Sequence, residues 1–119
     1  MGNYEKAIED LTKAISLDPN DSRDYHWRGS TYSKMGRYEK AIEDLTIAIS
    51  LDPDSWFSYH WRGRTYNEMG RYEKAIEDLT IAISLDPNKW QSYNWRGILP
   101  GNTSNTLWTD YIPFKDLPQ

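Results

Sequence analysis

Histidine and carboxylate side chains are the groups in this sequence best suited to chemistry, and their spacing argues against both metal binding and catalysis. His26 and His60 lie 34 residues apart, at equivalent positions of a repeated segment. Equivalent residues on neighbouring packed helices are separated by about 8–10 Å, which is too far for two imidazoles to bind one ion at about 2 Å each. The aspartates and glutamates recur on helix surfaces expected to face solvent, with no isolated pair placed for acid–base work. We therefore expect no metal, no cofactor and no enzymatic activity.

The composition argues against further classes of protein. There is no cysteine, which excludes disulfides and thiolate chemistry. The net charge is −4, from 14 Lys and Arg against 18 Asp and Glu, and this disfavours nucleic-acid binding because phosphates require a concentrated basic surface. No apolar run follows Met1, so we expect neither a signal peptide nor a membrane span and take the cytoplasm as the location.

The elements that position these side chains come from an internal repeat of 34 residues. Gly29, Gly63 and Gly97 are separated by this interval, and residues 36–53 are identical to residues 70–87. Self-similarity at a fixed period of this length is typical of repeat architectures, in which each unit buries its apolar face against its neighbours.

Each period predicts two helices. The first covers about 23–35 and again 57–69, each followed by a glycine stop, and the second begins near Tyr38 and Tyr72 and ends before Asp-Pro. Spacings of three and four residues place one apolar stripe on the second helix, formed by Tyr38, Ala41, Ile42, Leu45, Ala48 and Ile49. The other side carries Glu39, Lys40, Glu43 and Asp44.

The motif within each period resembles the tetratricopeptide repeat, whose pattern is W-x-x-L-G-x-x-Y, then A-x-x-x-F, then P. The first full period here has Tyr25, Arg28, Gly29, Tyr32, Ala41, Leu45 and Pro53 at these positions, and the second repeats them. The arginine in place of leucine is the main departure, and it suggests a position at a packing margin where the stem covers apolar surface. The resemblance implies an all-α, right-handed solenoid of antiparallel helix pairs.

The phase of the repeat defines the domain organisation. We expect a repeat array over 1–99, in which full repeats at 22–55 and 56–89 are flanked by half-repeats at 2–21 and 90–99. A non-repeat tail follows at 100–119, and its apolar stretch around Trp108 and Tyr111 is too apolar for a disordered linker.

The half-repeats allow three interpretations. The terminal halves of different molecules could meet head-to-tail, the tail could cap the last helix of its own chain, or the sequence could be a fragment of a longer array.

The resemblance implies that the first helices line a concave groove that binds an extended peptide or partner helix. The matching positions are Arg23, His26, Trp27, Ser30, Phe57, His60, Trp61, Arg64, Gln91, Asn94, Trp95 and Ile98. Trp27, Trp61 and Trp95 are displaced by about 200° from the core stripe of the first helix, at 100° per residue. Such a ladder of aromatic rings marks a recognition surface, although each tryptophan could instead pack against the adjacent repeat.

The residues of this groove favour a particular kind of ligand. Arg23 and Arg64, together with the two histidines, make the groove mildly basic, so the preferred ligand contains acidic residues with proline or aromatic anchors. The carboxylate clamp of the family, which binds the C-terminal peptides of chaperones, is not expected, because its five positions hold His26, Ser30, Trp61, Gln91 and Trp95. We therefore expect a module that binds a protein or peptide, with a self-assembling structural unit that joins copies through the half-repeats or the tail as the alternative.

Overall fold

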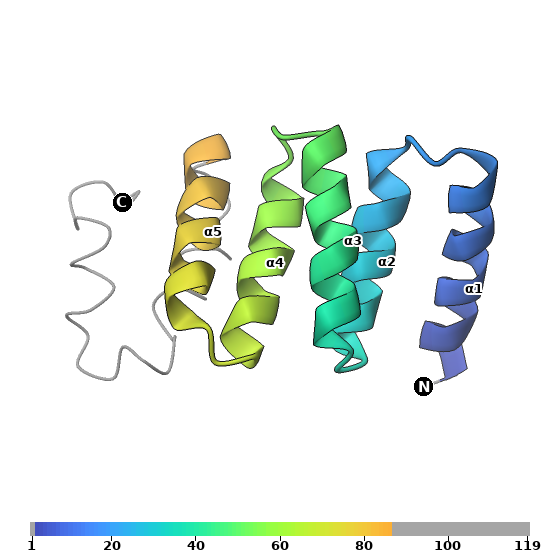
Figure 1. Cartoon of the computed structure of the whole chain (residues 1–119), viewed down its shortest axis with the longest axis horizontal. Helices are drawn as coiled ribbons and strands as arrows, with labels where there is room; N and C mark the ends of the chain where they lie inside the picture. Colours follow the sequence, from blue (N-terminus) through green and yellow to red (C-terminus); the bar gives the residue numbers. More distant parts are fainter. Residues whose placement is uncertain (1, 87–119) are drawn as a thin grey trace.

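The computed structural model describes residues 2–86, which form a row of five α-helices without a strand in that range (Figure 1). The helices are α1 (Gly2–Leu17), α2 (Ser22–Lys34), α3 (Tyr38–Leu51), α4 (Trp56–Glu68) and α5 (Tyr72–Leu85). The all-α architecture of antiparallel helix pairs is confirmed, and the predicted helix boundaries agree to within about a residue. The predicted half-repeat at 90–99 and the tail at 100–119 lie outside the described residues. None of the five helices is long and apolar enough to cross a membrane.

A glycine in the left-handed region ends each first helix. Gly36 has φ of 82° and Gly70 has φ of 80°. After α2, Gly36 N donates to the Ser33 carbonyl at 3.0 Å and Arg37 N donates to the Tyr32 carbonyl at 2.9 Å. These two bonds satisfy the last carbonyls of the helix and reverse the chain into α3. The same bonds follow α4, so the repeated glycine fixes the hairpin in both repeats.

The core of each hairpin is made of small residues and one leucine. The fully buried side chains of the second helices are Ala41, Leu45, Ala48, Ala75, Leu79 and Ala82. A Cβ atom added at Gly29 would lie 2.7 Å from Cγ of Leu45, and one at Gly63 would lie 2.8 Å from Cγ of Leu79. The two helices of a hairpin therefore approach until the leucine occupies the space that a side chain on the glycine would need.

One charged residue of the second helix lies in the interior, contrary to the sequence pattern. Asp44 was expected on the polar side of the helix, yet it is buried and forms two hydrogen bonds with Arg28. Arg28 Nη1 also donates to Thr12 Oγ1 of the preceding helix at 3.2 Å. Arg62 makes the same contacts with Asp78 and Thr46. Arg28 stands where the family pattern has leucine. Its polar contacts bind two helices together, a role that goes beyond the predicted covering of apolar surface by its stem.

Successive first helices contact each other directly along one side of the stack. In the described part of the chain, α4 packs against α3 and also touches α2, whereas the second helices approach one another less closely. Thr65 Oγ1 of α4 is completely buried and lies 2.8 Å from Ser33 Oγ of α2. The side on which first helices meet is called the inner face below.

Candidate functional site

The inner face carries a continuous cluster of aromatic rings from α2 and α4. The rings of His26 and Phe57 stack with centroids 4.6 Å apart, and Trp27 lies 5.5 Å from Phe57. The cluster continues within α4, where Phe57 lies 6.4 Å from Trp61 and 5.3 Å from Trp56. The predicted positions His26, Trp27, Phe57 and Trp61 are thus brought together by the packing of α2 against α4.

The two tryptophans of the predicted ladder lie in different environments. Trp27 is 49% exposed, whereas Trp61 is 9% exposed. Trp61 packs into the core cluster that contains Ala41 and Leu45 of the preceding repeat. Trp27 occupies the equivalent position on α2, where no preceding first helix is packed against it within residues 2–86. The ladder is therefore partly exposed surface, at Trp27, and partly inter-repeat core, at Trp61.

Two cationic side chains flank the indole of Trp61. Lys34 Nζ lies 5.4 Å from the centroid of this ring and Arg64 Cζ lies 4.4 Å from it. Both distances are within the range of cation–π attraction. The two cations and the ring belong to an open pocket of about 580 Å³. Its lining residues are Tyr4, Ser33, Lys34, Tyr38, Trp61, Arg64 and Glu68. Aromatic and cationic groups predominate in this pocket, and Glu68 is its one acidic residue.

The two histidines of the inner face are neutral at pH 7. Burial lowers the pKa of His60 to about 4, and the nearby positive charge of Arg64 acts in the same direction. Burial also lowers the pKa of His26, against a weaker opposing effect of Asp52. The histidines therefore add aromatic surface and no charge, contrary to the expectation that they make the groove basic.

Arg23 forms an ion pair with a neighbouring carboxylate. Arg23 Nη2 lies 2.9 Å from Oδ2 of Asp21, and the pair sits at the exposed start of α2. The cations beside the Trp61 ring are Lys34 and Arg64, and the charge of Glu68 acts on Arg64. Ser30, the remaining predicted residue of α2, is buried and lies 3.0 Å from the carbonyl of Trp27, so it supports the helix. The predicted positions Gln91, Asn94, Trp95 and Ile98 lie outside the described residues.

Sequence reasoning missed Lys34, Trp56 and Tyr4 as residues of this face. A signal for Lys34 exists in the differences between the two full repeats, which vary at eight positions, six of them in the first helix. Ser33 and Lys34 are replaced by Asn67 and Glu68, and Ser30 by Arg64. Four of the seven pocket residues stand at these variable positions. The pocket is consequently a feature of one place in the array, although the repeats that build it are almost identical.

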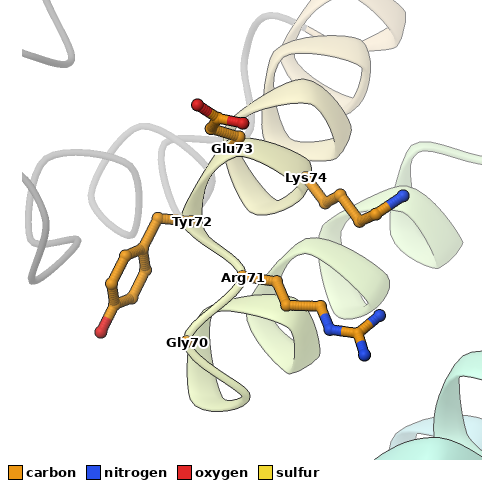
Figure 2. A pocket seen from close by; sticks show the side chains of 5 residues that line it. All are labelled: Gly70, Arg71, Tyr72, Glu73 and Lys74. Atoms are coloured by element: carbon orange, nitrogen blue, oxygen red, sulfur yellow. The ribbon is translucent and has the colours of Figure 1, made fainter.

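A second kind of hollow recurs where each second helix begins. Gly70, Arg71, Tyr72, Glu73 and Lys74 line a pocket of about 430 Å³ at the start of α5, and Figure 2 shows Arg71 and Lys74 extending to one side and Tyr72 to the other. The equivalent residues at the start of α3 line a pocket of about 460 Å³. Because the same turn sequence forms both, this hollow follows from the hairpin and does not distinguish a ligand site.

Among residues 2–86, no group of three or more His, Asp or Glu side chains is arranged to hold a metal ion.

Comparison with known proteins identifies the family. Profiles of the tetratricopeptide repeat match residues 11–43 and 56–89, which together make up more than half of the sequence. The chain belongs to the tetratricopeptide repeat family. No curated protein matches the sequence.

Solved structures of this family share the fold. A crystal structure of MamA is 28% identical over 91% of this chain, with a TM-score of 0.81, and the chain spans 63% of that protein's length. The first such domain of Spaghetti (RPAP3), bound to the HSP90 peptide SRMEEVD, is 27% identical, with a TM-score of 0.76 over 78% of this chain and 74% of that one. The second domain of human RPAP3, in complex with the HSP70 peptide SGPTIEEVD, is 31% identical, with a TM-score of 0.74 over 78% of both chains.

Proposed function

We propose that this chain binds an extended segment of another protein along the inner face, with an acidic side chain of the ligand over Trp61. The observation that carries the proposal is the placement of Lys34 and Arg64 on the same indole ring, at the edge of an open pocket. A carboxylate of the ligand placed in this pocket would accept charge-assisted hydrogen bonds from Lys34 or Arg64.

The aromatic cluster supplies the second part of the proposed recognition. Trp27 is half-exposed and lies against Phe57, so it offers a flat apolar surface beside the cationic pocket. Aromatic or proline side chains of a ligand would bury this ring, and buried aromatic anchors contribute a large share of binding energy at protein interfaces. The preferred ligand is therefore an acidic segment with an aromatic or proline residue nearby. The predicted positions Gln91, Asn94, Trp95 and Ile98 would extend the same face.

Similar structures support binding of this kind and differ in the residues that would perform it. The two RPAP3 domains hold peptides that end in EEVD. In this chain the five positions of the carboxylate clamp hold other residues, and the cations lie at Lys34 and Arg64 instead. The ligand is therefore expected to differ in sequence from a chaperone C-terminus while sharing its negative charge.

A peptide array provides the test. The full chain is applied to random peptides of about 12 residues, long enough to cover an interface of standard size, in which one position is fixed as acidic, basic or aromatic. Peptides with a fixed Asp or Glu should bind best, and Lys34→Glu should shift the preference towards fixed Lys or Arg. Lys40→Glu makes the same charge change on α3, outside the Trp61 pocket, and should leave the preference unaltered. Equal binding of acidic and basic peptides, or a preference that Lys34→Glu does not change, would contradict the proposal.

A further inference from the structure

An exposed apolar pair recurs on the second helix of each full repeat. Ile47 and Leu51 lie one turn apart on α3 and are each 39% exposed. The equivalent residues of α5, Ile81 and Leu85, are 38% and 37% exposed. At about 100° per residue, Ile47 is displaced by about 200° from the buried Leu45, so the pair is directed away from the core of the hairpin. The surface formed by these two apolar pairs is called the outer face below.

The exposure of the pair on α3 is a property of the interior of the array. Both α2 and α4 pack against α3, and these neighbours still leave Ile47 and Leu51 uncovered. Single exposed apolar residues are ordinary on a protein surface, whereas apolar residues that gather on one face are typical of surfaces that bind another molecule.

The repeated sequence shows that the fold does not require an apolar residue at the first position of the pair. Residues 2–19 match residues 36–53 except at two positions. One of these is Lys13, which is exposed on α1 where α3 and α5 have Ile47 and Ile81. Because α1 forms with a lysine at this place, the isoleucines are not needed to form the helix, and burial by a partner would account for them.

Exposed carboxylates border the apolar pair at both ends. Glu43 lies one turn before Ile47 on α3, and Asp52 and Asp54 follow Leu51. The start of the same arrangement, a glutamate one turn before the apolar pair, is repeated on α5. A partner that covers the apolar pair therefore meets negative charge beside it.

The lysine on this side of each second helix is directed towards the preceding helix. Lys40 Nζ lies 5.7 Å from the ring centroid of Tyr32 in α2, and Lys74 Nζ lies 5.8 Å from that of Tyr66 in α4. The charges beside the apolar pairs are thus mainly negative, so two outer faces would repel each other. Their complement is a partner with basic residues beside an apolar stripe.

We propose that the outer face binds an amphipathic helix of another protein, with its apolar side chains against the two apolar pairs and its lysine or arginine side chains beside Glu43 and Glu77. A rise of about 1.5 Å per residue places Ile47 and Leu51 about 6 Å apart along the helix axis. Side chains at i and i+4 of an opposing helix have the same spacing, so the two sets can interdigitate. An extended peptide would be favoured by a sheet edge, and residues 2–86 form helices without a strand. This binding does not use the inner face and is independent of the peptide site proposed above.

Three synthetic peptides of about 18 residues, long enough to form a helix, test the proposal on the full 119-residue chain. The first carries leucines at i, i+4 spacing with lysines on both sides of the leucine stripe. The second has glutamate in place of every lysine, and the third has glutamine in place of every leucine. Fluorescence polarisation of the labelled peptides should show binding of the first and not of the other two.

Two sets of variants locate the binding surface. Ile47→Gln combined with Ile81→Gln should weaken binding of the first peptide by about tenfold or more, because both changes remove an apolar anchor. Glutamine favours helix at least as well as isoleucine, so α3 and α5 should remain folded. Leu17→Gln is the matched control, since it removes an exposed apolar side chain from α1, where Lys13 replaces the isoleucine. It should leave the affinity unaltered.

The double isoleucine variant should still bind the acidic peptides selected on the array, so failure of one proposal is distinguishable from failure of the other. Circular dichroism should show full helicity for each variant. Absence of binding by the first peptide, equal binding of the second or third, or an affinity that the double variant does not change would each overturn the proposal.

Sedimentation velocity tests the other occupant of this face, a second copy of the chain. The unaltered chain and the double isoleucine variant should sediment alike at every concentration. Self-association of the unaltered chain that the double variant abolishes would assign the outer face to a second copy and would also overturn the proposal.

Discussion

Arg62 holds the carboxylate of Asp78 with two hydrogen bonds, Nε to Oδ2 at 2.8 Å and Nη2 to Oδ1 at 2.9 Å, inside the second hairpin. The side chain of Asp78 is 4% exposed and that of Arg62 is 19% exposed. Burial raises the pKa of Asp78, and the hydrogen bonds from Arg62 oppose this effect. The arginine is therefore what keeps a buried carboxylate ionised in a helix interface.

Removing the arginine alone should destabilise the protein strongly. Arg62→Leu leaves an unpaired carboxylate in the interior, and breaking one partner of a buried pair costs about 3–5 kcal/mol. The double variant Arg62→Leu with Asp78→Leu removes both charges and should recover most of that loss, because an apolar pair of similar volume packs without the desolvation penalty. Urea unfolding followed by circular dichroism measures both.

Asp10→Leu is the comparison for this prediction. Asp10 is the equivalent aspartate on α1 and is largely exposed, so its replacement should change the free energy of unfolding of the monomer by less than about 1 kcal/mol. If Arg62→Leu were no more damaging than Asp10→Leu, the ion pair would not contribute to the hairpin.

The sequence predicted the helices and missed this pair for a physical reason. Glycine stops and Asp-Pro ends are local signals, so the helix boundaries could be read from consecutive residues. The Arg62–Asp78 pair joins two helices, and a periodicity argument that assigns every charged residue to solvent places Asp78 outside. The available signal was that arginine and aspartate recur together at a constant separation of sixteen residues in both repeats. The exposed fractions of Trp27 and Trp61 differ for a similar reason. The two residues have the same neighbours along the chain, and these neighbours do not indicate whether a helix of a preceding repeat packs against the ring.

The glycines of the repeat should respond differently to the same substitution. Gly63→Ala places Cβ 2.8 Å from Cγ of Leu79, and this overpacking should cost about 1–3 kcal/mol by forcing the helices apart. Gly70→Ala meets no atom within 4 Å but must adopt φ of 80°, which should cost about 1 kcal/mol. Thermal unfolding of the two variants would compare close packing with backbone strain, and a Gly63→Ala variant as stable as the unaltered chain would contradict the packing argument at Gly63.

The stability of the array should fall as the pH is lowered through the range in which histidine titrates. Burial lowers the pKa of His60 from 6.5 to about 4, so the unfolded chain binds more protons than the folded one between these values. The contribution of His60 to the free energy of unfolding is fully present above about pH 6.5 and is lost as the pH falls towards 4. Between pH 7.5 and pH 5 this loss is on the order of 2 kcal/mol.

His60→Phe isolates this effect, because it keeps an aromatic ring beside Trp56 and Trp61 and cannot take up a proton. Urea unfolding at pH 7.5 and pH 5 should show a smaller loss for the variant than for the unaltered chain. Other groups titrate in both proteins, so the difference between the two losses is the quantity that counts. An identical loss in both would show that His60 is not protonated on unfolding.

The two tryptophans of the inner face should separate stability from binding. Trp61 is buried against Ala41 and Leu45, and its replacement by alanine leaves a cavity in the inter-repeat core that should cost about 3 kcal/mol or more. Trp27 is half-exposed, and Trp27→Ala should reduce stability by less than about 1 kcal/mol while weakening binding of the acidic peptides selected on the array by about 1–2 kcal/mol. Thermal unfolding and fluorescence polarisation of a labelled peptide measure the two effects. Because Trp27→Ala remains folded, a peptide affinity equal to that of the unaltered chain would show that this ring is not an anchor, and the binding surface would then have to be confined to the Lys34–Trp61–Arg64 pocket.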